Sequence, residues 1–97
     1  MPESYSEPVH IAFSAESSSK RLVGRNQARR YLMIVNDSDT AIYLSLGKSA
    51  ALNSGIRVNA QGGSYELTEQ AGNLYKGEIH VIHGGTGSKT VLVTEGF

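Results

Sequence analysis

The segment 30–36, RYLMIVN, decides the fold class of this 97-residue chain. Its apolar run Tyr31–Val35 includes β-branched residues, which favour the pleated geometry of a strand. Successive residues of a strand point to opposite sides, so this run is apolar on both faces. Such a strand is typical of the centre of a sheet, or of a surface that lies beneath a neighbouring subunit. Both positions are open at this point.

A turn and a second strand follow directly. The segment 37–40, DSDT, consists of residues whose side chains hydrogen-bond their own backbone in turns. In the next segment, 41–47, the apolar residues Ile42, Leu44 and Leu46 alternate and therefore share one face of a strand. We expect the two strands to pair as a hairpin across the turn.

Further short strands are expected on both sides of this pair. Each is an alternating or β-branched run bounded by turn residues, and no helical period of 3.6 residues is sustained. Such spacing predicts an all-β fold, a small antiparallel β-sandwich or barrel of seven to eight short strands. Residues 1–8 are expected to form an extended, flexible N-terminal arm, followed by a single domain of residues 9–97. The further strands are expected at 9–14, 21–24, 56–59, 64–67, 78–83 and 89–95, and single helical turns fit 48–55 and 68–73.

Composition limits the classes of function. Nine basic and nine acidic side chains cancel, so the chain lacks the excess of Lys and Arg that nucleic-acid binding needs, and no nucleic-acid partner is expected. The longest wholly apolar run is Tyr31–Val35, whereas a membrane-spanning helix needs roughly 20 residues, so no membrane partner is expected. The absence of cysteine excludes disulfides and thiolate sites and fits assembly in a reducing cytoplasm.

The segment 84–90, GGTGSKT, looks like a phosphate-binding loop. A working loop reads G-x-x-x-x-G-K-[ST] and lies between a strand and a helix, whose N-terminus helps to hold the phosphates. Counting from Gly84, the required second glycine falls at Lys89, and β-branched residues follow where a helix is needed. The sequence therefore predicts a glycine-rich hairpin loop between two antiparallel strands and no nucleotide cofactor.

No constellation of catalytic or metal-binding residues is recognisable in the sequence. His80 and His83 lie three residues apart, which places them on opposite faces of a strand and hinders a shared metal ion. Both are interpreted as ordinary strand histidines, with His83, beside glycines, as a surface contact. No serine occupies a G-x-S-x-G elbow. We predict that the chain is not an enzyme and holds neither a metal ion nor a cofactor.

Charge is distributed unevenly along the first third of the chain. Five basic residues and no acidic residue lie at 20–30, whereas residues 1–16 carry three glutamates and neither Lys nor Arg. Three interpretations are open: an acidic arm paired with the basic segment, a basic ribbon that meets an acidic partner surface or nucleic acid, and a solvated loop. The candidate assembly contacts in and after this segment are Arg21, Arg25, Arg29, Arg30, Tyr31 and Met33.

From residue 30 onward the order of strands and turns resembles a known group of proteins. A basic residue precedes the apolar strand, and polar and glycine-rich turns separate the strands that follow. The last segment, 79–96, reads IHVIHGGTGSKTVLVTEG. The intervening residues that carry the pattern are Asn36, Ser38, Ile42-Tyr43-Leu44, Gly47, Gly55-Ile56 and Gly62-Gly63-Ser64-Tyr65-Glu66. This order resembles a group of small all-β proteins encoded among the virion genes of tailed bacteriophages.

The resemblance implies a structural role in the virus particle. Members of this group are parts of the head or of the head–tail junction and carry no catalytic residues. We therefore expect a capsid decoration or cement protein that stabilises the head through subunit–subunit contacts. It would be a homo-oligomer, bind the major capsid protein or other virion subunits, and reside in the virion after assembly in the host cytoplasm. The alternatives are a head-completion or head–tail connector protein, and a receptor- or carbohydrate-binding module of the tail.

Overall fold

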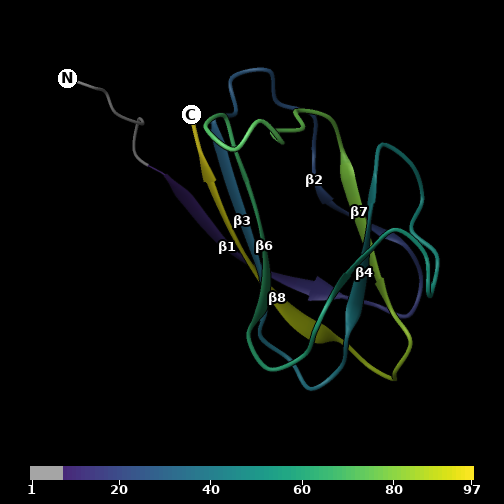
Figure 1. Cartoon of the computed structure of the whole chain (residues 1–97). Helices are drawn as coiled ribbons and strands as arrows, with labels where there is room; N and C mark the ends of the chain where they lie inside the picture. The colour runs from purple at the N-terminus through teal and green to yellow at the C-terminus, as the bar shows by residue number, and fades with distance from the viewer. Residues whose placement is uncertain (1–7) are drawn as a thin grey trace.

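The computed structural model describes residues 8–97 and arranges them as eight strands in two four-stranded sheets (Figure 1). The expected arm lies, apart from Pro8, outside these residues. Neither segment that fits a helical turn forms one, and residues 8–97 contain no helix. The strands are β1 (Val9–Ala15), β2 (Lys20–Val23), β3 (Tyr31–Asn36), β4 (Ile42–Leu46), β5 (Ile56–Val58), β6 (Gly63–Thr68), β7 (Ile79–His83) and β8 (Lys89–Gly96).

The strands pair as a long antiparallel ribbon that is rolled up on itself. β1 pairs with β8, β2 with β7, β3 with β6 and β4 with β5. Two further pairs, β3 with β8 and β4 with β7, complete sheets of order β1-β8-β3-β6 and β2-β7-β4-β5. This is the order of a jelly roll, in which eight strands form two packed sheets. The predicted antiparallel β-sandwich is therefore confirmed.

Both predicted hairpins are wrong. β3 and β4 follow one another across the turn, yet they lie in different sheets, and so do β7 and β8. Each of these strands pairs with two other strands of its own sheet instead. The reason is burial, because β3 and β4 contribute their inner rows to one core from opposite sides. A turn sequence specifies a reversal of direction and is compatible with either arrangement.

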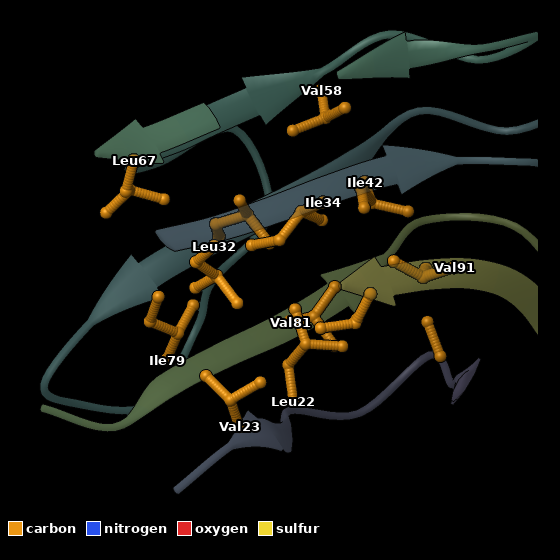
Figure 2. Close-up of a cluster of buried hydrophobic side chains, with 13 residues drawn as sticks. Leu22, Val23, Leu32, Ile34, Ile42, Val58, Leu67, Ile79, Val81 and Val91 are labelled. Atoms are coloured by element: carbon orange, nitrogen blue, oxygen red, sulfur yellow. The ribbon is translucent and has the colours of Figure 1, made fainter. Parts of the chain in front are cut away.

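The core lies between the two sheets (Figure 2). Leu32 and Ile34 of β3 point into it from the first sheet, and Ile42 and Leu44 of β4 from the second, and all four are fully buried. Burying one such side chain contributes about 1.5–3 kcal/mol, so these alternating rows supply the main stabilisation. The buried cluster consists of Ala15, Leu22, Val23, Leu32, Ile34, Ile42, Leu44, Val58, Leu67, Ile79, Val81, Val91 and Val93.

Candidate assembly surface

The centre of the outer surface of the first sheet is apolar and is not covered by the described residues. In β3, Tyr31, Met33 and Val35 alternate with the buried row and are only half-buried. Leu92 of β8 lies beside Val35 and is 40% exposed, and Ala12 of β1 lies beside Leu92. We call these five residues the bare face. Open apolar patches of this kind are typical of contacts with another molecule.

Polar groups border the bare face without giving it a strong charge. His10 Nδ1 and Thr94 Oγ1 lie 2.9 Å apart on the same outer surface, and Glu66 of β6 lies beside Met33. The outward-facing strand residues of this sheet include neither Lys nor Arg. Any contact with another molecule on this surface would therefore rest on apolar packing and hydrogen bonds and would depend weakly on salt.

Two of the candidate assembly contacts, Tyr31 and Met33, belong to the bare face. β3 lies between β8 and β6, so its prediction as a central strand is confirmed. A contact beneath a neighbouring subunit stays a prediction, for which the outer row of β3 is available. Sequence reasoning missed Leu92. The signal was the run Val91-Leu92-Val93, which is apolar on both faces as the β3 segment is.

The outer surface of the second sheet differs from that of the first sheet, because it carries arginines and is partly covered by the connection 47–55. The connection 47–55 is fastened to its neighbours, because Ala50 N–H donates to Ser19 Oγ at 2.9 Å and Tyr43 OH donates to Asn53 Oδ1 at 3.1 Å. This surface is thus polar and partly covered, whereas the first sheet presents apolar side chains. Its outward-facing residues include Arg21, Tyr43, Arg57 and His80.

Arg29, a candidate assembly contact, is instead fully buried at one end of the sandwich. Its Nε donates to Glu95 Oε2 at 2.7 Å, and its Nη1 donates to the carbonyls of Tyr75 at 2.7 Å and Gly77 at 3.2 Å. Its Nη2 donates to the carbonyl of Gly24 at 2.6 Å. A buried guanidinium needs such partners, because an unpaired charge in the interior is costly. Arg29 is therefore a structural residue, and its prediction as a contact is corrected.

The other arginines of the basic segment, Arg21, Arg25 and Arg30, are exposed. Arg21 Nη1 lies 3.7 Å from Glu78 Oε2, and Arg30 Nε lies 3.3 Å from Glu69 Oε1. Carboxylates of the same chain thus offset both charges, which weakens the interpretation as a basic ribbon. Arg25 is also exposed. Contacts of Arg21, Arg25 and Arg30 with a partner stay predictions.

Only one of the three glutamates of the expected acidic arm lies among the described residues. Glu3 and Glu7 lie outside the described residues. Glu16, the third glutamate of that region, accepts a hydrogen bond from Ser88 Oγ at 2.6 Å and does not meet the basic segment. The acids that do meet it come from the C-terminal half of the chain.

The glycine-rich loop at 84–88 connects β7 to β8 across the two sheets, so it is not a hairpin loop. Lys89 Nζ donates to Asp39 Oδ1 at 2.9 Å, and this hydrogen bond is the main cause that holds the pKa of Asp39 below 3.8, followed by one from Thr40. The segment after the loop is a strand, as expected. A phosphate-binding loop is thereby excluded, since it requires a helix at this place.

His83 organises this loop from the inside. It is fully buried, so its interpretation as a surface contact is wrong. Its Nδ1 accepts the N–H of Gly85 at 3.1 Å, which leaves the ring proton on Nε2 to donate to the carbonyl of Gly87 at 2.7 Å. Both ring nitrogens are engaged within the chain. Sequence reasoning missed this role because the sequence around a strand histidine does not show which groups its ring hydrogen-bonds.

Two kinds of arrangement are absent from residues 8–97. No group of three or more His, Cys, Asp or Glu residues in this range is arranged to hold a metal ion. Within the same range, no helix is long and apolar enough to cross a membrane. The described residues form a sandwich of two sheets with the bare face on one outer surface.

Comparison with known proteins adds no relative: no protein-family model, curated protein or solved structure matches the chain.

Proposed function

We propose that this protein is a structural component of a tailed-bacteriophage virion, a capsid decoration or cement protein that binds through its bare face. The observation that carries the proposal is the apolar, nearly uncharged outer surface of the first sheet. A particle component works by burying surface against its neighbours, and an open apolar surface on a rigid sheet is suited to that task. Many copies on a symmetric particle turn weak single contacts into firm attachment.

The resemblance to phage virion proteins and the fold point in the same direction. Viral capsid domains are among the proteins built as jelly rolls. Lectin domains and cupins share this architecture, so the fold alone does not select a function. The resemblance begins at residue 30, and the strands that follow include β3 and β8, which carry most of the bare face.

The carbohydrate-binding alternative has one specific feature in its favour. A hollow of about 260 Å³ on the second sheet is lined by Tyr43, Asn53, Ser54, Gly55 and Arg57. An aromatic ring beside polar groups is a combination that can bind a sugar. The described tyrosines are all at least half-buried, however, and they form no exposed aromatic platform within residues 8–97. The decoration role therefore remains the better supported one.

Co-sedimentation with capsids tests the proposal. The capsids are assembled from the major capsid protein encoded nearest to this gene, expanded, and mixed with increasing amounts of the purified protein. Saturable binding at a copy number set by capsid symmetry is expected. Binding at one vertex only would support the connector alternative instead, and no binding at all would contradict both roles.

A pair of variants identifies the surface that binds. Met33→Glu places a charge in the middle of the bare face and is expected to weaken capsid binding about tenfold or more, because a charge without a partner is costly at an apolar contact. Arg57→Glu, on the outer surface of the second sheet, is the matched control and is expected to bind as the wild type does. Equal binding by both variants contradicts the assignment of the bare face.

A separate measurement tests the carbohydrate-binding alternative. Binding of phage-receptor polysaccharide that is lost in Tyr43→Ala would favour this alternative.

A further inference from the structure

The two sheets have four edge strands, and the two in the second sheet are protected. Edge strands expose unpaired backbone groups that can pair with another chain, and charges, bulges and short length prevent this. β2 carries Lys20 and Arg21, and its register shifts between Arg21 and Val23. β5 has only three residues, with Arg57 at its centre. Both edges are therefore protected against pairing with a further strand.

β6, one edge of the first sheet, is blocked by a side chain. Asn73 Nδ2 donates to the carbonyl of Glu66 at 2.9 Å, and Asn73 Oδ1 accepts the N–H of Thr68 at 3.0 Å. These are the backbone groups that a further strand would use, since the other side of β6 pairs with β3. Asn73 therefore takes the place of a pairing strand at the end of this edge formed by residues 66–68.

β1, the opposite edge of the first sheet, has none of these protections. It pairs with β8 over seven residues without a shift in register. It contains neither Pro nor a residue of formal charge, and its sequence is VHIAFSA. Its apolar residues Val9 and Ile11 are 40% and 48% exposed, although they lie on the inner face opposite Glu95 and the buried Val93. β1 is thus a long, straight and apolar edge, the kind that pairs with another strand.

We propose that β1 pairs antiparallel with β1 of a second copy of this chain, joining two first sheets into one continuous sheet of eight strands. A two-fold axis perpendicular to the sheet keeps the inner rows of both copies on the same face, so a residue must lie opposite itself. Ala12 is the middle of Val9–Ala15, and an axis there pairs all seven residues of both strands.

The side chains of β1 are complementary to themselves in this register. Ile11 lies opposite Phe13 of the second copy, a β-branched residue beside an aromatic ring, which is a favourable cross-strand pair. His10 lies opposite Ser14, and the large Val9 lies opposite the small Ala15. No like charges meet, because the strand carries no formal charge. This edge has no charge that could select a different partner chain. The lack of charge therefore favours a second copy.

Burial also favours the symmetric pair. Along the inner row of β1, Val9 and Ile11 are exposed, Phe13 is half-buried and Ala15 is fully buried. The two-fold axis sets the exposed half of one strand beside the buried half of the other. The second copy thereby supplies neighbours for Val9 and Ile11 that residues 8–97 of the same chain do not.

Sedimentation equilibrium of the full chain tests the pairing. The wild type is expected to approach twice its 10.4 kDa mass as its concentration rises from about 1 µM to about 1 mM, because association follows mass action. Ile11→Lys is expected to weaken the dimer about tenfold or more, since an inward charge on an edge strand opposes pairing. Leu52→Lys, in the connection 47–55 and 46% exposed, is the control and is expected to dimerise. A monomeric wild type, a dimeric Ile11→Lys variant or association without limit would each overturn the proposal.

Cysteine cross-linking tests the register, and the natural chain has no cysteine to interfere. In Ala12→Cys the two thiols face each other at the axis, where Cα atoms of opposed residues are about 4.5–5.5 Å apart, within the range for a disulfide. Ser64→Cys, on the outer surface of the blocked edge β6, is the matched control. Rapid disulfide dimerisation of Ala12→Cys alone is expected, and equal rates for the two variants would overturn the register.

This inference is independent of the proposed function. A protein that dimerises through β1 without binding capsids would contradict only the virion role. A monomer that binds capsids through the bare face would contradict only the pairing of β1.

Discussion

The strands are joined by loops at the two ends of the sandwich (Figure 1). These two ends are held together by different chemistry. At the arginine end, formed by the connections 24–30 and 69–78, the charged side chain of Arg29 ties the loops to Glu95 of β8. The histidine end is formed by the connections 37–41 and 84–88. There the neutral side chains of Asn36 and His83 hydrogen-bond the backbone of these loops. A buried charge that loses its partner destabilises the fold more than a buried neutral group does. Substitutions at the two ends should therefore lower the free energy of unfolding by different amounts.

The largest effect is expected at Arg29. Arg29→Met removes the guanidinium and leaves Glu95, whose side chain is only 15% exposed, without its cation. Breaking a buried ion pair in this way costs roughly 3–5 kcal/mol of unfolding free energy. Urea denaturation monitored by circular dichroism measures the change. Arg30→Met, next in the chain, removes an exposed ion pair and is expected to cost only about 0–1 kcal/mol. Similar costs for both variants would refute the structural role of Arg29.

Asn36 is expected to have the second largest effect. Its Nδ2 donates to the carbonyls of Thr40 at 2.8 Å and Val58 at 3.1 Å, and its Oδ1 accepts from Ser38 Oγ at 2.6 Å. Asn36→Ala leaves these groups without their partner at a fully buried position, at a cost of about 1–3 kcal/mol. The same urea titration measures it. Asn59→Ala, at an exposed site, is the control, and a loss as large as that of Asn36→Ala would speak against a special role for Asn36.

A smaller effect is expected at His83. His83→Phe keeps a ring in the core but loses both hydrogen bonds to the loop at 84–88. The cost is about 0.5–1.5 kcal/mol, since water can replace the partner of the exposed Gly87 carbonyl. Amide hydrogen exchange at Gly85 is the sharper measurement, because its N–H donates to the imidazole. Unchanged protection of Gly85 in this variant would contradict the assigned hydrogen bond.

The smallest effect, and one that depends on pH, is expected at Asp39. The hydrogen bond from Lys89 lowers the pKa of Asp39 in the folded chain below the value of 3.8. A lowered folded pKa means that the contribution to stability is fully present above pH 3.8 and is lost as the pH falls through the folded pKa. Asp39→Asn should therefore be less stable than the wild type at pH 7, with the difference vanishing in stronger acid. Thermal unfolding of Asp39→Asn in the background of Lys89→Met is the control, where the pH dependence should shrink to the smaller part that the hydrogen bond from Thr40 supplies.

The strands were predictable because their signals are local. Alternation in 41–47 and the doubly apolar run in 30–36 report which side chains are buried, whichever strands lie beside them. The boundaries of β1, β3 and β8 agree with those expected within one or two residues. The phosphate loop could be rejected for the same reason, since the β-branched residues after Lys89 already argue against a helix.

The candidate surface was predictable only in part. The outer row of β3 was within reach, and Tyr31 and Met33 were named as contacts. The five basic residues at 20–30 looked alike in sequence, yet Arg29 is buried whereas Arg21 and Arg30 are exposed and paired with acids. The acidic partners of these side chains come from segments about 40 to 66 residues away, and no local pattern records them.

The sequence by itself determined the all-β class, the positions of the eight strands and the absence of a phosphate-binding helix. These properties follow from side-chain shape and from the two-residue period of a strand, which are local. Tertiary structure alone decided that β3 and β4 face each other across a core, that Arg29 and His83 close opposite ends, and that β1 is the unprotected edge. Those properties depend on which distant strands bury each other's inner rows, and the free energy of that burial belongs to the whole sandwich.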